Sequence, residues 1–205
     1  NNVIITVIGI VGIIVFSSMS AYIISRKKNK YTKFAQFMIT TPMLIPFQTI
    51  MITLLKVMNV VNLSGSKVGL GIQYWGFGIP MAAFIYGNFM STIPKELDES
   101  AFIDGAGTFR TYRSIIFPLL KSVTFTVIVI DVMWIWNDYL LPSLVLGRKE
   151  LYTLPIATQA FYGTYSTDMG LVMAALLLAM LPILILYLFL QRYIVEGVTS
   201  GAVKG

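Results

Sequence analysis

Five apolar stretches, each about twenty residues long, leave few choices for the fold of this chain. A helix of that length rises about 30 Å, which matches the hydrocarbon thickness of a bilayer. The sequence is 57% hydrophobic and only 12% charged, whereas soluble domains carry about 25% charged residues. We therefore expect an all-α polytopic membrane protein. The predicted spans cover residues 3–24, 34–55, 68–90, 123–144 and 171–190.

The basic residues predict an orientation. Of the 15 Lys and Arg residues, eleven lie in the loop after the first span, the loop after the third span and the C-terminal tail. Loops rich in Lys and Arg usually face the cytoplasm. The C-terminus is therefore expected inside, and residue 1 outside. We read the net charge of +6 as this topological bias and not as a nucleic-acid-binding surface.

Several chemistries are missing from the sequence. It contains no Cys and no His, so disulfides, thiolate metal sites and imidazole general-base chemistry are excluded. No G-x-x-x-x-G-K-[ST] phosphate loop is present either. We expect no enzymatic activity, no bound metal and no cofactor in this chain.

A polar segment, residues 91–121, separates the third and fourth spans. Pro94 suits a first helical turn, and Glu96, Asp98 and Glu99 follow where the helix dipole favours acidic side chains. Gly105 and Gly107 predict the end of a helix of about ten residues. Leu97 and Ala101 are expected to lie on one face of this helix, at i and i+4. A second helical stretch is predicted from Thr108 to Phe117, with a break at Pro118 before span four.

This segment resembles the EAA loop of ABC-importer permeases. The loop's pattern is E-A-A, three residues, G, nine residues, then I-x-L-P. Here it is matched in spacing by Glu99-Ser100-Ala101 with Gly105, followed by Ile115-Ile116-Phe117-Pro118. Ser100 and Phe117 depart from the pattern. The resemblance implies that Glu99, Ser100, Ala101, Asp104, Gly105 and Ala106 form a coupling helix that contacts a separate ATPase, which binds ATP and Mg.

Further motifs resemble the maltose-type branch of carbohydrate permeases. They are Trp136-Asn137-Asp138-Tyr139 in span four, Leu154-Pro155, Thr167-Asp168-Met169-Gly170, and the C-terminal segment 191–205. The resemblance implies a type I ABC-importer transmembrane domain over residues 1–205 in the cell membrane of a prokaryote. That family has six spans, so we expect the first to be missing here. It also implies a second permease subunit, an ATPase dimer and an extracytoplasmic sugar-binding protein.

Span four also holds the candidates for a substrate path: Asp131, Trp136, Asn137 and Asp138. A carboxylate inside a membrane is costly and usually faces a cavity or a partner. Asp131 and Asp138 are seven residues apart, which predicts a shared helix face about 10.5 Å long. Asp131 has three open interpretations, namely pairing with a neighbouring helix or subunit, contact with a sugar, and proton coupling.

Other function classes remain open at this point. A proton-coupled secondary transporter could use Asp131, a membrane scaffold would transport nothing, and an ABC permease could carry a solute other than a sugar. The polar segment discriminates among them, because only an ABC permease needs a cytoplasmic contact for an ATPase. The extracytoplasmic loop, residues 143–168, is expected to meet the binding protein.

Overall fold

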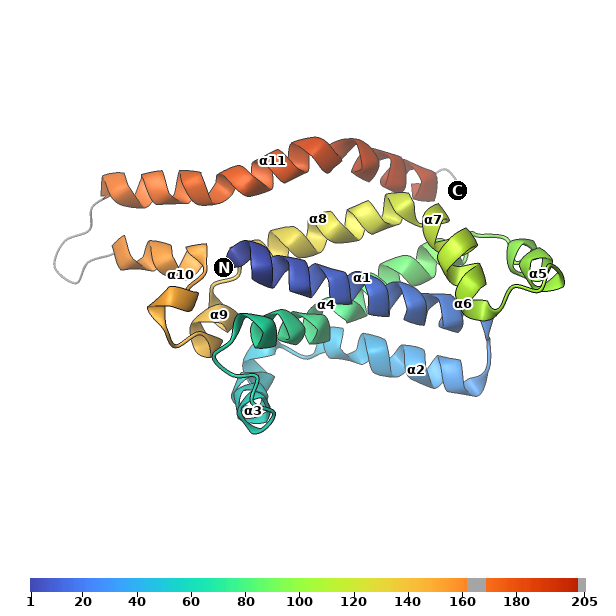
Figure 1. Cartoon of the computed structure of the whole chain (residues 1–205), viewed down its shortest axis with the longest axis horizontal. Helices are drawn as coiled ribbons and strands as arrows, with labels where there is room; N and C mark the ends of the chain where they lie inside the picture. Colours follow the sequence, from blue (N-terminus) through green and yellow to red (C-terminus); the bar gives the residue numbers. More distant parts are fainter. Residues whose placement is uncertain (162–168, 203–205) are drawn as a thin grey trace. The chain divides into compact units, whose positions relative to one another are not determined.

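The computed structural model describes residues 1–161 and 169–202, with the side chains at 160, 190 and 192–202 excepted. Residues 162–168 and 203–205, which include parts of the predicted outside loop and of the C-terminal motif, lie outside the described residues. The described chain is helical and contains no strand. Its helices are α1 (Asn2–Arg26), α2 (Lys30–Thr40), α3 (Phe47–Val60), α4 (Lys67–Met90), α5 (Glu96–Ile103), α6 (Thr108–Thr111), α7 (Phe117–Leu119), α8 (Lys121–Asn137), α9 (Leu140–Val145), α10 (Leu154–Thr158) and α11 (Met169–Ala202) (Figure 1).

Three of the five predicted spans are single long helices in the structure, and the other two are bent. Within the described residues, α1, α4 and the Met169–Phe189 part of α11 are long and apolar enough to cross a membrane. Two further spans arise if each bent helix pair counts as one, namely Lys30–Leu44 with Phe47–Val60 and Thr108–Leu119 with Lys121–Asn137. Pro46, which lacks a backbone donor, precedes the first residue of α3 and accounts for the first break.

The start of α2 is fixed by local hydrogen bonds. The Asn29 side chain accepts bonds from the backbone N–H groups of Tyr31 and Thr32, both at 2.9 Å. The Thr32 hydroxyl accepts from the Asn29 N–H in return at 3.1 Å. This reciprocal capping box satisfies donors that a helix start otherwise leaves open, so the basic loop after α1 leads directly into a helix.

The chain forms two compact units. Unit 1 contains residues 1–11, 46–75 and 129–190. Within it, α1 and α4 approach closely at Gly71, where an added Cβ would lie 2.6 Å from Ile8 Cγ2. The Trp75 indole N–H donates to the Ile8 carbonyl at 2.9 Å. A small residue thus permits a helix contact of the type common in membranes.

Unit 2 contains residues 12–45, 76–128 and 191–205. Its core buries Tyr86, whose hydroxyl donates to Thr124 Oγ1 at 3.0 Å. Ser18 on α1 and Tyr112 share a hydrogen bond of 2.7 Å. Tyr112 opens a π-helical turn, Tyr112–Ile116, between α6 and α7. The polar segment of the sequence analysis therefore belongs entirely to unit 2.

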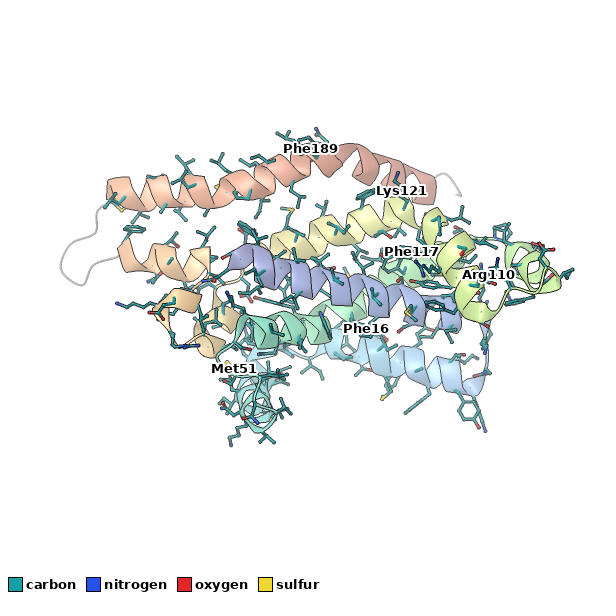
Figure 2. The ribbon with its side chains drawn as sticks, viewed as in Figure 1. Phe16, Met51, Arg110, Phe117, Lys121 and Phe189 are labelled. Carbon is teal, nitrogen blue, oxygen red and sulfur yellow. The ribbon has the colours of Figure 1, made fainter. Side chains whose placement is uncertain are left out.

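Two predicted helix ends differ from the structure. Pro118 does not break the chain; it lies in the first turn of α7, where a missing N–H is tolerated, and the bend comes at Leu120. Span four does not continue as one helix to residue 144, because α8 ends at Asn137 and α9 begins at Leu140. Arg110 on α6 and Phe117 on α7 flank the π-helical turn (Figure 2).

Large apolar side chains remain exposed on several helices. Neither α2 nor α3 has a buried residue, and only 11% of the α11 span window is buried. Phe189 on α11, labelled in Figure 2, is 72% exposed. Surfaces of this kind suit lipid or another membrane subunit.

Candidate functional site

The first candidate site is α5, the helix predicted from the acidic segment after Pro94. Gly105 has φ +78°, a left-handed conformation that costs glycine little. The N–H of Ala106 donates to the Ala101 carbonyl at 2.9 Å, and the N–H of Gly105 to the Phe102 carbonyl at 3.0 Å. These two bonds form a Schellman motif. The predicted stop at Gly105 is therefore confirmed.

The face of α5 that packs inward carries Asp98 and Ala101. Asp98 and Ala101 are buried, at 5% and 4% exposure, while Leu97 is 37% exposed. Residues three apart share a helix side, so the inner face is rotated by one position from the Leu97–Ala101 pair. Asp98 lies on the inner face because its carboxylate contacts Tyr22 and Arg26 of α1.

Asp98 is held by two residues near the end of α1. The Tyr22 hydroxyl donates to Asp98 Oδ1 at 2.6 Å, and Arg26 Nε lies 2.9 Å from Asp98 Oδ2. The side chains of Arg26 and Asp98 are only 12% and 7% exposed. We call Tyr22, Arg26 and Asp98 the α5 anchor. A buried carboxylate is tolerated when it is paired and hydrogen-bonded in this way.

The anchor also reaches the end of α4. Arg26 Nη1 donates to the Ile93 carbonyl at 3.0 Å and lies 3.5 Å from the Met90 carbonyl. One guanidinium thus connects α1, α5 and the chain that follows α4, using the fork of donors that arginine provides. Any displacement of α5 must break these bonds or move α1 and α4 with it.

The predicted coupling residues divide between the two faces of α5 and its cap. Ala101 is buried and Ala106 is half-buried, whereas the remaining four are exposed. Beside them Phe102 and Ile103 are also exposed, Ile103 to 86%. The outer face therefore combines carboxylates with bare apolar side chains, a composition suited to a protein contact. The exposed predicted residues are Glu99, Ser100, Asp104 and Gly105.

The second candidate site lies at the end of α8 in unit 1. Trp136 and Asn137 line a cavity of about 270 Å³ together with Tyr139, Thr158 and Gln159. Pro155 and three residues of α11, Leu176, Ala179 and Met180, complete the lining. The Trp136 indole donates to the Ala179 carbonyl at 3.0 Å. Aromatic rings beside amide and hydroxyl groups are chemically able to bind a sugar.

The two carboxylates of the predicted path are not part of this cavity. Asp138 accepts a 2.8 Å bond from the Tyr74 hydroxyl and a 3.0 Å bond from the Leu140 N–H. These bonds end α8 before Asp138, so the predicted helix face shared by Asp131 and Asp138 is wrong. Asp131 lies within α8 and is 5% exposed.

Sequence reasoning missed several polar residues of both units. Tyr74, Thr158 and Gln159 were not predicted, nor were the roles of Tyr22 and Arg26 in the anchor. Both side-chain polar atoms of Gln73 are buried and lack a hydrogen-bond partner among the described residues. A glutamine inside an apolar span was the available signal for Gln73, because such residues usually face a partner or a cavity.

Comparison with known proteins shows the family of this chain. The profile of the binding-protein-dependent transport system inner membrane component family matches residues 6–200. The chain belongs to this family. Its members are transport subunits of the membrane, in agreement with the apolar helices of the structure.

Two relatives cover the whole chain. A probable starch degradation products transport system permease protein of Thermoanaerobacterium thermosulfurigenes is 44% identical over 100% of this chain and 74% of its own length. A melibiose/raffinose/stachyose import permease protein of Bacillus subtilis is 38% identical over 100% of this chain and 75% of its own length.

A solved structure matches the fold. One chain of a bacterial ABC transporter involved in the import of the acidic polysaccharide alginate superimposes with a TM-score of 0.82. The match covers 95% of this chain and 73% of that one, at 21% sequence identity. The fold is therefore that of a type I ABC-importer transmembrane domain, as predicted.

Proposed function

We propose that this chain is a membrane-spanning permease subunit of an ATP-driven carbohydrate importer. The observation that carries the proposal is family membership over residues 6–200 combined with a short helix, α5, that exposes carboxylates and apolar side chains outside the spans. The substrates named for the two relatives, starch degradation products for one and melibiose, raffinose and stachyose for the other, favour a carbohydrate cargo. Uptake of radiolabelled oligosaccharide by the reconstituted complex tests the proposal.

In this proposal α5 couples the permease to a separate ATPase. ATP and Mg are bound by that partner, because this chain has no phosphate-binding loop. Ile103 and Phe102 enter an apolar cleft of the ATPase, while Glu99 and Asp104 meet basic groups at its rim. The α5 anchor then transmits the displacement of α5 to α1, so that this chain does mechanical work without being an enzyme.

The other partners follow from the proposed orientation. The distribution of Lys and Arg supports a cytoplasmic polar segment and C-terminus. Residues 143–168 then lie outside, where a sugar-binding protein docks. A second permease covers part of the exposed apolar surface of the spans, and lipid covers the rest. A cysteine introduced at Lys149, which is exposed, should react with a membrane-impermeant reagent added outside; reaction from the cytoplasmic side alone would contradict this orientation.

The substrate path of the proposal runs past Trp136 and Asn137. Asn137 is exposed, and its amide donates to the Met133 carbonyl one turn earlier, at 2.7 Å. Asn137→Ala should therefore leave assembly intact and reduce sugar uptake several-fold, because a lost sugar hydrogen bond costs about 1 kcal/mol. Asn59→Ala, the same change on α3, is the matched control. Equal uptake by both variants and the wild type would remove the cavity from the path.

The second candidate function is proton-coupled secondary transport. The burial of Asp131 within α8 favours it. No described residue forms an ion pair or a hydrogen bond with its buried carboxylate. Asp131→Asn keeps the shape and removes the charge. Under our proposal this variant retains ATP-driven uptake when the complex assembles, whereas a proton-coupled carrier loses transport altogether.

A further inference from the structure

A second cavity lies wholly within unit 2, among α1, α2 and α4. Its volume is about 420 Å³. Four cationic residues line it, namely Arg26, Lys28, Lys33 and Lys95, and no Asp or Glu does. The cavity lining also includes the hydroxyl groups of Ser25 and Thr32 and the amide group of Asn88. The cavity is therefore an anion-attracting site at the basic end of these helices.

The three lysines of this cavity are available to a ligand. Arg26 is engaged by Asp98 in an ion pair. Lys28, Lys33 and Lys95 have no acidic partner within the described chain and are exposed at the cavity. Three uncompensated cations around one cavity repel one another unless an anion enters.

An apolar groove continues from this basic cavity. It has a volume of about 360 Å³ and shares Gln36, Thr40 and Phe84 with the cavity. Its other walls are Phe37, Thr41, Met43 and Leu44. The side chains of Phe37 and Leu44 are 60% and 83% exposed, so the groove has open apolar walls.

The length of the combined site matches one bilayer leaflet. From Lys33 to Leu44 the chain follows α2 and then the 3₁₀ turn Thr41–Leu44, which gives a rise of roughly 18 Å. Half of the hydrocarbon core is about 15 Å. Figure 1 shows α2 beginning directly after the loop that follows α1. The cations Lys28 and Lys33 lie at this end of α2, and the groove residues Phe37 to Leu44 follow toward its other end.

We propose that this site binds one anionic phospholipid of the adjoining leaflet, with its phosphate among Lys28, Lys33 and Lys95 and an acyl chain along the groove. Basic pockets between spans are known to suit such head groups. A neutral sugar would gain nothing from the uncompensated cations, and a free phosphate compound would leave the groove empty. The bound lipid would hold α2 against α1 and α4, next to the α5 anchor.

Binding of the lipid head group by the cavity is tested by a pair of matched variants. Lys28→Gln/Lys33→Gln removes two charges from the lining of the cavity. Lys27→Gln/Lys30→Gln removes two charges from the same basic segment, but neither residue lines the cavity. Native mass spectrometry of the purified complex, titrated with phosphatidylglycerol, measures binding. We expect the first variant to bind roughly 25-fold more weakly, since each lysine near anionic lipid contributes about a factor of five. Equal losses in both variants would overturn the site.

The acyl half is tested with brominated lipid. Phe84→Trp places an indole where cavity and groove meet. The fluorescence of this indole is obtained by subtracting the emission of the wild-type complex from that of the variant complex. Phosphatidylglycerol brominated on its acyl chains should quench it more strongly than equally brominated phosphatidylcholine. Inorganic phosphate should not compete. Equal quenching by the two brominated lipids would indicate contact with bulk lipid. No quenching would indicate that a protein partner covers the groove. Either result overturns the proposal.

Discussion

Asp98→Ala is expected to destabilise the membrane subunit more than any other single change in the polar segment. It leaves the Arg26 guanidinium buried without its carboxylate and removes the acceptor of the Tyr22 hydroxyl. Removing one partner of a buried ion pair typically costs about 3–5 kcal/mol. The thermal midpoint of the purified complex should fall, and proteolysis should cut the loop around α5 faster.

Two companion variants separate the anchor from a general charge effect. Glu96→Ala removes an equal charge from the first turn of the same helix, but Glu96 is exposed, so a loss below about 1 kcal/mol is expected. Arg26→Leu/Asp98→Leu replaces the pair by apolar groups, a change that is often close to neutral. If the double variant is as unstable as the single one, the ion pair is not what holds α5.

Gly105→Val is expected to uncouple ATP hydrolysis from transport. Gly105 has φ +78°, and a β-branched side chain in that conformation costs about 1–2 kcal/mol. Relief of this strain would unwind the Schellman motif and displace Ile103 and Phe102, the side chains proposed to enter the ATPase. Stimulation of ATP hydrolysis by the binding protein should then be lost, while basal hydrolysis by the ATPase persists.

Gly107→Val is the control for this prediction. Nothing lies within 4 Å of a Cβ added at either glycine, so neither variant clashes within the chain. Gly107 has φ −76°, which valine adopts without strain. Normal stimulation in the Gly107 variant and none in the Gly105 variant is the expected pair of results. If both behave like the wild type, the turn after α5 does not position the contact.

Features set by local sequence were predictable. The spans follow from runs of apolar residues, and α5 follows from Pro94, three early carboxylates and Gly105, all of which act within a few residues. The inner face of α5 was not predictable in this way. It depends on Tyr22 and Arg26, more than seventy residues earlier in the chain, and a charged residue at Asp98 reads locally as solvent-facing.

The end of α8 was missed for the same reason. Residues 123–144 are uniformly apolar enough to suggest one span, but Asp138 is bound by Tyr74 of α4 and caps Leu140. The cavity beside Trp136 likewise combines α8, α10 and α11, which no spacing within one helix reveals. Single-sequence patterns give the elements, whereas these sites arise from contacts between elements.

ATP-dependent sugar uptake tests the central claim most directly. The complete importer, with its ATPase, second permease and binding protein, is reconstituted into proteoliposomes with radiolabelled oligosaccharide on the binding-protein side. Our account predicts uptake that requires ATP and Mg at the ATPase, persists when a protonophore removes the proton gradient, and fails when the ATPase is omitted. Uptake by this chain driven by a proton gradient without ATP, and abolished by Asp131→Asn, would contradict the account.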